Sequence, residues 1–261
     1  MSEQGEPTVL VEREGLIAIV TLNAPKRRNA FSLAMREALY QNLHALMHEA
    51  ECCAIVLTGA AGTFCAGGDI SEMQERTLLE YRERNLLPLD VFRLMVTGPK
   101  PVVAAVEGYA MGAGVSLAAA ADYVVSAENV RYACAFVKVG LLPDSGIYWS
   151  LAQRVGPAKA RELLMTAREF DGAEAGRIGF ANEVVAAGSA RAKALEIAAH
   201  FTTLPPVTLA LLKSALATGT STIEDACRVE LDLNPLTRQT QDHHEAVAAF
   251  LEKRKPHFIG R

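Results

Sequence analysis

The fold of this chain is decided by two glycine-rich stretches, Phe64-Cys65-Ala66-Gly67-Gly68-Asp69-Ile70 and Glu107-Gly108-Tyr109-Ala110-Met111-Gly112-Ala113-Gly114. Each follows a short apolar run that is typical of a buried strand, at residues 54–58 and 101–106, and each precedes a predicted helix. Turns that are poor in side chains can direct free backbone N–H groups at one point. Such a pair of donors stabilises negative charge on an oxygen, so the two stretches predict an oxyanion hole.

The composition limits the size of the core, the partners and the class of protein that are possible. Half of the 261 residues are apolar, which is enough for one large domain or a core with an appendage. A net charge of −4 gives no general attraction to nucleic acid or to an anionic membrane. The five cysteines are an odd number without metal-ligand spacing, which favours reduced thiols in a cytoplasmic protein. Charges and glycines interrupt every apolar stretch before the roughly 20 residues of a membrane span.

Hydrophobic periodicity predicts strands at 9–12, 16–22, 54–58, 101–106 and 122–126. Ser32 is expected to cap a helix that ends near residue 50, and helical segments are expected at 71–97 and 115–121. After Gly140 the pattern is mainly helical, with candidates at 158–167, 173–178, 189–203, 205–217, 222–232 and 240–253. We therefore expect an α/β core over residues 1–200 and a C-terminal helical region over residues 201–261.

The order of these motifs resembles the enoyl-CoA hydratase/isomerase (crotonase) family along essentially the whole chain. Besides the two glycine stretches, the matching motifs are Leu22-Asn23-Ala24-Pro25 with Arg28-Asn29-Ala30-Phe31, Gly140-Leu141-Leu142-Pro143-Asp144-Ser145-Gly146 and Ala249-Phe250-Leu251-Glu252-Lys253-Arg254. The resemblance implies a spiral of β-β-α repeats with a helical trimerisation region. It also implies an acyl-CoA thioester substrate, no further cofactor or metal, and a homotrimer or a dimer of trimers.

The resemblance also assigns roles to individual residues. The oxyanion-hole N–H groups would belong to Gly68 and Ala113. The residues expected to contact CoA or the acyl chain are Arg28, Ala30, Ala66, Gly68, Asp69, Ile70, Ala113, Ser116, Phe136, Phe250 and Lys253. Cations among Lys26, Arg27 and Arg28 would meet the phosphates of CoA. Phe250 and Lys253 match positions that reach CoA in a neighbouring subunit.

The sequence departs from the family where hydratases carry two glutamates that activate water. Ser116 stands at the first of these positions and Phe136 at the second. A hydroxyl group and a phenyl ring cannot perform general acid–base catalysis near neutral pH. Hydration by the two-glutamate route is therefore disfavoured.

One carboxylate, that of Asp144, remains in the matching neighbourhood. Several isomerases of the family place a single acid in this loop, where it moves a proton between two carbons of the acyl chain. A single base and an oxyanion hole suffice for that 1,3-shift, and Phe136 would help by excluding water. Two alternatives remain open: Asp144 caps the following helix, or Glu72 or Glu83 supplies the acid.

The sequence thus predicts an acyl-CoA enzyme, with enoyl-CoA double-bond isomerisation as the favoured reaction and Asp144, Gly68 and Ala113 as its catalytic groups. A hydratase or acyl-CoA hydrolase that uses another base is a second interpretation. A non-catalytic acyl-CoA-binding protein is a third.

Overall fold

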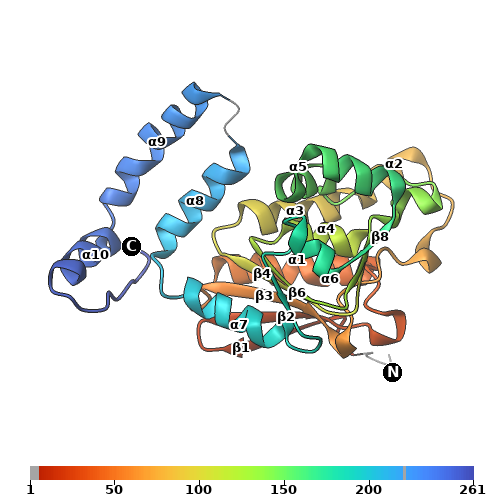
Figure 1. Cartoon of the computed structure of the whole chain (residues 1–261), viewed down its shortest axis with the longest axis horizontal. Coiled ribbons are helices and arrows are strands. Elements are labelled where there is room, and N and C mark those ends of the chain that lie inside the picture. Colours follow the sequence, from red (N-terminus) through yellow and green to blue (C-terminus); the bar gives the residue numbers. More distant parts are fainter. Residues whose placement is uncertain (1–5, 220–221) are drawn as a thin grey trace.

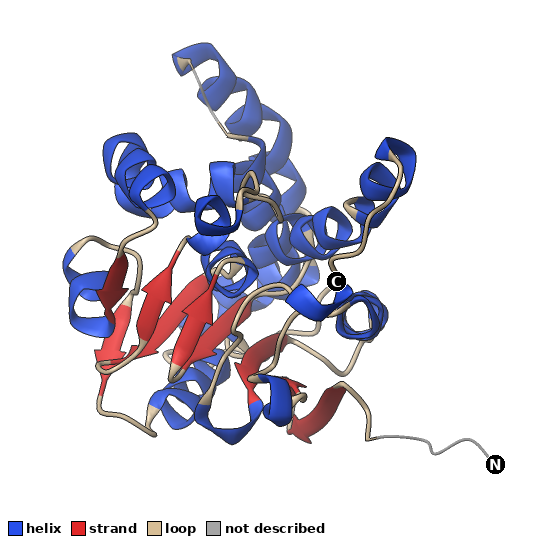
Figure 2. Cartoon of the chain, turned by 90° about the vertical axis from the view of Figure 1, so that its right-hand side faces the viewer, coloured by secondary structure: helices blue, strands red, loops and turns tan. Residues whose placement is uncertain are grey.

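A six-stranded sheet and a three-stranded sheet form the core of the computed structural model, which describes residues 6–219 and 222–261 (Figure 2). The larger sheet has the order β1-β2-β3-β4-β6-β9, built from Val9–Glu14, Ile17–Leu22, Ala54–Gly59, Val102–Val106, Tyr123–Ala127 and Glu183–Val185. The smaller sheet has the order β5-β7-β8, built from Tyr109–Met111, Arg131–Ala133 and Glu169–Asp171. Only the β1–β2 pair of the larger sheet is antiparallel. Parallel strands are covered on both faces, which explains why β2 is apolar almost throughout and buried at all six residues.

The two sheets are linked as a spiral of β-β-α turns. In one turn β4 leads to β5 and then to α4 (Ala113–Ala120), and in the next β6 leads to β7 and then to α5 (Ile147–Thr166). In the preceding turn β3 leads to an extended segment around Cys65, which bridges Ala110 of β5, and then to α2 (Leu78–Arg84) and α3 (Leu86–Thr97). The spiral predicted from the family resemblance is therefore present.

Helices bury both faces of the larger sheet. On one face lies α1 (Leu33–His48), which begins where the Oγ of Ser32 accepts a hydrogen bond from the N–H of Met35 at 3.3 Å. The other face is covered by α7 (Ala190–Phe201). Its buried alanines, Ala190, Ala194 and Ala198, pack with Ile19, Val56 and Val103. Alternate residues of each strand thus serve two hydrophobic clusters, as the period of two requires.

Several predicted boundaries are wrong for identifiable reasons. The helical region expected from residue 71 begins at Leu78, where Thr77 and Glu80 form a capping box. The helix expected at 158–167 matches the second part of α5, which a non-helical bend at Gly156, with φ 74°, separates from an unpredicted first part that begins at Ile147. Strands β5, β7, β8 and β9 have three residues each and were not predicted, since so short a segment shows no periodicity. The short helix α6 (Gly172–Arg177) lies close to the prediction.

The C-terminal helices form an arm that projects from the core (Figure 1). It consists of α8 (Pro206–Thr218), α9 (Ile223–Arg238) and α10 (Gln241–Leu251). In the described part of the chain no single helix is long and apolar enough to cross a membrane, and α7 with α8 passes that test only as a pair bent by 109°. The division near residue 200 stays a prediction.

A buried lysine ties this arm to the core. Lys213 of α8 is 8% exposed, and its Nζ donates hydrogen bonds to the backbone oxygen of Lys100 at 2.8 Å and to Oδ2 of Asp122 at 2.6 Å. The same carboxylate oxygen accepts a hydrogen bond from the N–H of Val102, the first residue of β4. Burial lowers the pKa of Lys213, so its charge depends on this partner.

We expect Lys213→Met to lower the free energy of unfolding by about 2 kcal/mol, because Asp122 loses its cation while it keeps partial access to solvent. Chemical denaturation monitored by circular dichroism measures this change. Lys159→Met, which removes an exposed pair with Glu162, is the control and should cost no more than about 0.5 kcal/mol. Equal effects of the two substitutions would contradict an anchoring role for Lys213.

Candidate active site

The two glycine stretches lie side by side because they occupy the same position in successive turns of the spiral. The N–H of Cys65 donates to the oxygen of Tyr109, and the N–H of Met111 donates to the oxygen of Cys65, both at 2.9 Å. A Cβ atom on Gly67 would lie 2.9 Å from the oxygen of Met111, and one on Gly114 would lie 2.3 Å from the oxygen of Cys65. Glycine is therefore required at both positions by the close approach of the two backbones.

This pairing predicts that the N–H groups of Gly68 and Ala113 lie close together. Cys65 pairs with Ala110 in parallel register, and a Cβ on Gly112 would lie 4.0 Å from the Cα of Gly67, so we expect the next residues, Gly68 and Ala113, to be neighbours. Within residues 6–219 and 222–261, neither N–H has a hydrogen-bond acceptor. Ala113 is the first residue of α4, where the helix dipole adds partial positive charge. Two free donors at this point suit a developing negative charge on oxygen.

An aromatic ring and a thiol border the two loops. Ring atoms of Phe136, which is 7% exposed, lie 3.8 Å from the position that a Cβ of Gly112 would take. This ring lies against Gly112, the residue that precedes α4. Burial raises the pKa of the Cys65 thiol to about 12, so Cys65 is a core residue and not a nucleophile at neutral pH.

Asp144 lies on the loop before α5, and its side chain does not cap that helix. The N-cap residue is Gly146, and among the described residues no backbone N–H of α5 donates to the carboxylate of Asp144. The carboxylate is half-buried and accepts a hydrogen bond at 2.9 Å from the Oγ of Ser145. The helix-capping interpretation of Asp144 is therefore wrong, and its carboxylate remains available for chemistry.

Ser116 positions the Asp144 loop. It lies fully buried in α4, and its Oγ contacts the backbone oxygen of Asp144 at 3.2 Å and that of Gly112 at 3.4 Å. The serine thus joins the helix that carries Ala113 to the loop that carries the acid. Sequence reasoning noted the residue but did not foresee this contact.

The first glycine stretch is also fixed to the segment that precedes α1. The N–H of Ala66 donates to the oxygen of Arg28 at 3.0 Å, and the N–H of Phe31 donates to the oxygen of Gly67 at 2.7 Å. These contacts place Arg28 and the half-buried Ala30 beside Ala66 and Gly68, and their role in binding CoA stays a prediction. The Arg28 guanidinium stacks over the Tyr109 ring, with its Cζ 5.1 Å from the ring centroid.

Asn29 supports this segment and was missed by sequence reasoning. The residue is fully buried with φ 55°, a left-handed conformation that asparagine tolerates better than most residues. Its Nδ2 donates to the oxygens of Ala60 and Thr63, and its Oδ1 accepts from the N–H of Ala24. An asparagine directly after three exposed basic residues was the available signal.

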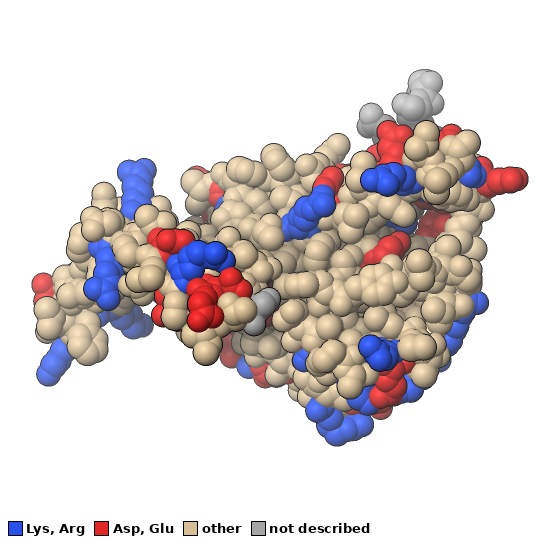
Figure 3. Space-filling view, turned by 90° about the horizontal axis from the view of Figure 1, so that it is seen from above, with Lys and Arg blue, Asp and Glu red and all other residues tan. Residues whose placement is uncertain are grey.

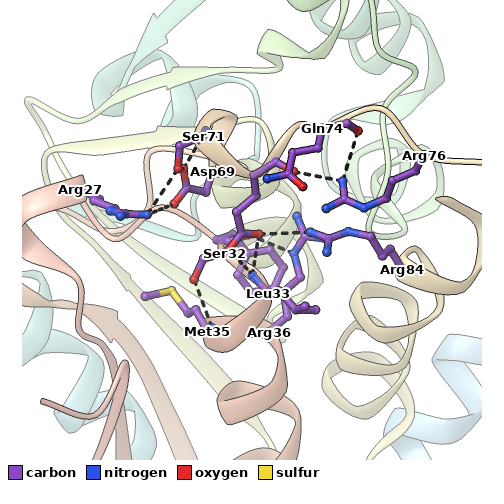
Figure 4. A network of polar contacts seen from close by, with 12 residues as sticks. Arg27, Ser32, Leu33, Met35, Arg36, Asp69, Ser71, Gln74, Arg76 and Arg84 are labelled. Carbon is purple, nitrogen blue, oxygen red and sulfur yellow. Dashed lines mark hydrogen bonds and ion pairs between the residues drawn. The ribbon is translucent and has the colours of Figure 1, made fainter. Parts of the chain in front are cut away.

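Asp69 orients the end of the first glycine stretch (Figure 4). Its Oδ1 accepts hydrogen bonds from the Oγ of Ser71 at 2.6 Å and from its N–H at 3.0 Å, and its Oδ2 lies 2.7 Å from Nη1 of Arg27. The hydrogen bonds from Ser71 and then from Arg27 hold the pKa of Asp69 below its ordinary value. The carboxylate is thus a weak base that braces the loop, and the next residue, Ile70, is exposed.

The carboxylate of Glu72 is engaged in structural contacts. It accepts from the N–H of Leu33, the first residue of α1, at 3.0 Å and pairs with Nη2 of Arg84 at 3.1 Å (Figure 4). Glu83 lies exposed on α2. Neither glutamate is placed as favourably as Asp144. Arg36 lies close to these groups, and sequence reasoning did not single it out.

Two predicted CoA contacts are remote from the glycine loops of their own chain. Phe250 lies on α10 with 84% of its surface exposed, and Lys253 follows that helix on the projecting arm (Figure 1). Their distance from the core agrees with the expectation that they serve a neighbouring subunit, which stays a prediction.

Comparisons with known proteins agree along almost the whole chain. A family model described as enoyl-CoA hydratase/isomerase matches residues 12–261. The chain is 35% identical over 249 residues to the short-chain-enoyl-CoA hydratase of Clostridium acetobutylicum, covering 95% of each protein. It is 33% identical over 260 residues to the 1,2-epoxyphenylacetyl-CoA isomerase of Escherichia coli, covering 97% of this chain and 98% of the relative.

A solved structure gives the same result. The enoyl-CoA hydratase from Polaromonas sp. JS666 superposes with a TM-score of 0.91 at 33% identity, covering 96% of this chain and 99% of that one. The similar curated relatives carry mostly hydratase names, with one isomerase among them. The predicted crotonase-like fold is therefore confirmed.

We expect Ala113→Pro to lower kcat on a thioester substrate about 10²- to 10³-fold, because proline removes the N–H donor. Proline is tolerated at the first position of a helix, so α4 should persist. Steady-state kinetics measures the loss, and Ala113→Ser, which keeps the N–H, is the matched control. Full activity in the proline variant would exclude Ala113 as a donor.

Proposed function

Because the chain belongs to the enoyl-CoA hydratase/isomerase family, we propose that it is an acyl-CoA enzyme whose reaction is the shift of a carbon–carbon double bond. The observation that carries this proposal is one uncommitted carboxylate, that of Asp144, tied through Ser116 to the helix that begins at Ala113. Chemistry at a carbon next to a thioester needs one base and one site for the negative oxygen.

The proposed reaction moves a single proton. The Asp144 carboxylate takes a proton from the carbon between the thioester and the double bond of a 3-enoyl-CoA. The electron pair of that C–H bond moves toward the thioester, and the N–H groups of Gly68 and Ala113 hold the resulting oxyanion. Protonated Asp144 then returns the proton to the far carbon of the former double bond, which yields the 2-enoyl-CoA. No water is consumed, and Asp144 regains its charge.

Two features support isomerisation over hydration. Ser116 and Phe136 occupy the positions at which the family resemblance places the hydratase glutamates, and neither side chain acts as an acid or a base. The ring of Phe136 also lies beside Gly112 at the start of α4, where it would hinder a water molecule from reaching the oxyanion hole.

Hydration is the second candidate, because hydratase names predominate among the relatives. In that case Asp144 would activate water. Product analysis separates the reactions, since hydration adds one water to the acyl chain and isomerisation adds nothing. A hydrolase would instead release free CoA.

We expect Asp144→Asn to lower turnover of 3-enoyl-CoA about 10²- to 10⁴-fold, because the amide cannot accept the proton. The amide oxygen can still accept the hydrogen bond from Ser145, so the loop should keep its position. Conversion to the conjugated 2-enoyl-CoA is followed by absorbance, and binding of a saturated acyl-CoA is measured by calorimetry.

Asp90→Asn, on the partly exposed side of α3 where Asp90 pairs with Arg93, is the matched control and should keep wild-type turnover. Wild-type rates in Asp144→Asn would exclude Asp144 as the base. Tight acyl-CoA binding by the wild type without turnover of any 3- or 2-enoyl-CoA would favour the non-catalytic interpretation.

We also infer that the protein assembles as a homotrimer through its C-terminal arm. The arm exposes large apolar side chains, as an interface would: Leu212, Leu216, Ile223, Leu231, Leu236, Phe250 and Leu251. A face of the molecule that includes part of the arm carries charges of both signs scattered over a mostly uncharged surface (Figure 3). A cytoplasmic location and the absence of a cofactor other than the CoA thioester stay predictions.

Light scattering coupled to gel filtration should give three times the mass of one chain, or six times for a dimer of trimers. Leu231→Arg together with Leu236→Arg should lower this mass, because two charges would have to be buried in the interface. A wild-type monomer at micromolar concentration would contradict the trimer.

A further inference from the structure

The cationic side chain of Arg36 lies against the first glycine stretch, which contains Gly68. It belongs to the first turns of α1, and its Nη2 is 3.9 Å from the position that a Cβ of Gly68 would take. Two contacts hold it there: Nε donates to the oxygen of Phe31 at 3.0 Å, and the guanidinium lies over the Phe31 ring at 5.3 Å. The Nε end of the guanidinium is thus fixed in place (Figure 4).

The outer nitrogens of this guanidinium are unused. In the part of the chain that the structure describes, neither Nη1 nor Nη2 of Arg36 has a hydrogen-bond or ion-pair partner. The nearby carboxylate of Glu72 is already engaged by the N–H of Leu33 and by Arg84. The free donors of this half-buried guanidinium can take up an anionic ligand in place of water.

Arg36 lies toward Arg84 of α2 and away from Arg27, the neighbour of Arg28 (Figure 4). Burial lowers its pKa, and the carboxylate of Asp144 is the largest influence in the opposite direction, followed by others that include Glu72. Arginine nevertheless stays charged near neutral pH. Asp144 is the group proposed to act on acyl carbons, whereas the segment expected to hold the CoA phosphates is that of Arg28. We therefore expect the group that binds Arg36 to be part of the acyl chain.

We propose that Arg36 binds a carboxylate carried by the acyl chain beyond the reacting carbons, so that the preferred substrates are acidic acyl-CoA thioesters. The inference rests on the proposed function only in placing an acyl-CoA thioester in this site. The planar guanidinium presents Nη1 and Nη2 to the two carboxylate oxygens in a bidentate arrangement. The pair forms beside the Phe31 ring, where partial burial weakens competition from water.

The test compares binding of two matched series of saturated thioesters by calorimetry. One series carries a terminal carboxylate on acyl chains of five to eight carbons, and the other has the same chain lengths without it. We expect the wild type to bind at least one acidic thioester about tenfold to a hundredfold more tightly than its neutral counterpart. Arg36→Met should bind the two series equally, and Arg36→Lys should keep part of the preference.

Arg82→Met, an exposed cation on α2, is the matched control and should keep the wild-type preference. A wild type without preference at any chain length overturns the proposal, and this measurement does not depend on the folding of any variant. Equal loss of both series in a folded Arg36→Met variant also overturns it, because Arg36 would then act only on the common part of the ligand.

Saturated thioesters cannot be isomerised, so this outcome is independent of the proposed reaction. A preference for acidic thioesters without turnover of 3-enoyl-CoA would leave the role of Arg36 intact and contradict the isomerase. Turnover of 3-enoyl-CoA without a preference for acidic thioesters would support the isomerase and contradict the role of Arg36.

Discussion

The parallel pairing between the second strands of successive turns is the constraint on which the site depends. Cys65 pairs with Ala110, and Ala110 pairs with Tyr132, so three turns of the chain run in register. Residues just beyond these pairs are thereby placed near residues of the next turn. Gly68 and Ala113 are expected to be one such pair, and Phe136 of the third turn lies beside Gly112. A shift of this register would separate the two N–H groups, whatever residues stood there.

This register requires glycine at several positions, because the backbones of adjacent turns approach closely there. A side chain on Gly67 or Gly114 would collide with the backbone of the adjacent turn, and one on Gly108 would lie 2.3 Å from the oxygen of Gly62. These residues therefore act by letting two backbones meet, while the chemistry belongs to N–H groups beside them. This explains why glycine-rich stretches that contain no catalytic side chain nevertheless mark the site.

Much of the fold was predictable from the sequence, because its long elements carry strong local signals. The cap at Ser32, the apolar runs of β2, β3 and β4, and the small-residue helix after Gly112 are close to their predicted places. The three-residue strands were not predictable, since they owe their existence to pairing between turns. The same limit applied to the site: the glycine loops were recognisable, but the contacts of Asn29 and Arg36 join segments that only the fold brings together.

The distribution of charge explains how one acid can be free in a site that contains several. Asp69 pairs with Arg27 and accepts a hydrogen bond from Ser71. Glu72 pairs with Arg84 and accepts a hydrogen bond from the first N–H of α1. Both carboxylates therefore hold structural contacts. Asp144 has a single hydroxyl contact through Ser145, which leaves its carboxylate able to accept a proton. Ser116 does not replace the acid of a hydratase; its hydroxyl contacts the backbone oxygen of Asp144 and leaves the carboxylate of that residue untouched. In the proposed reaction, holding the loops and moving the proton would therefore fall to different carboxylates.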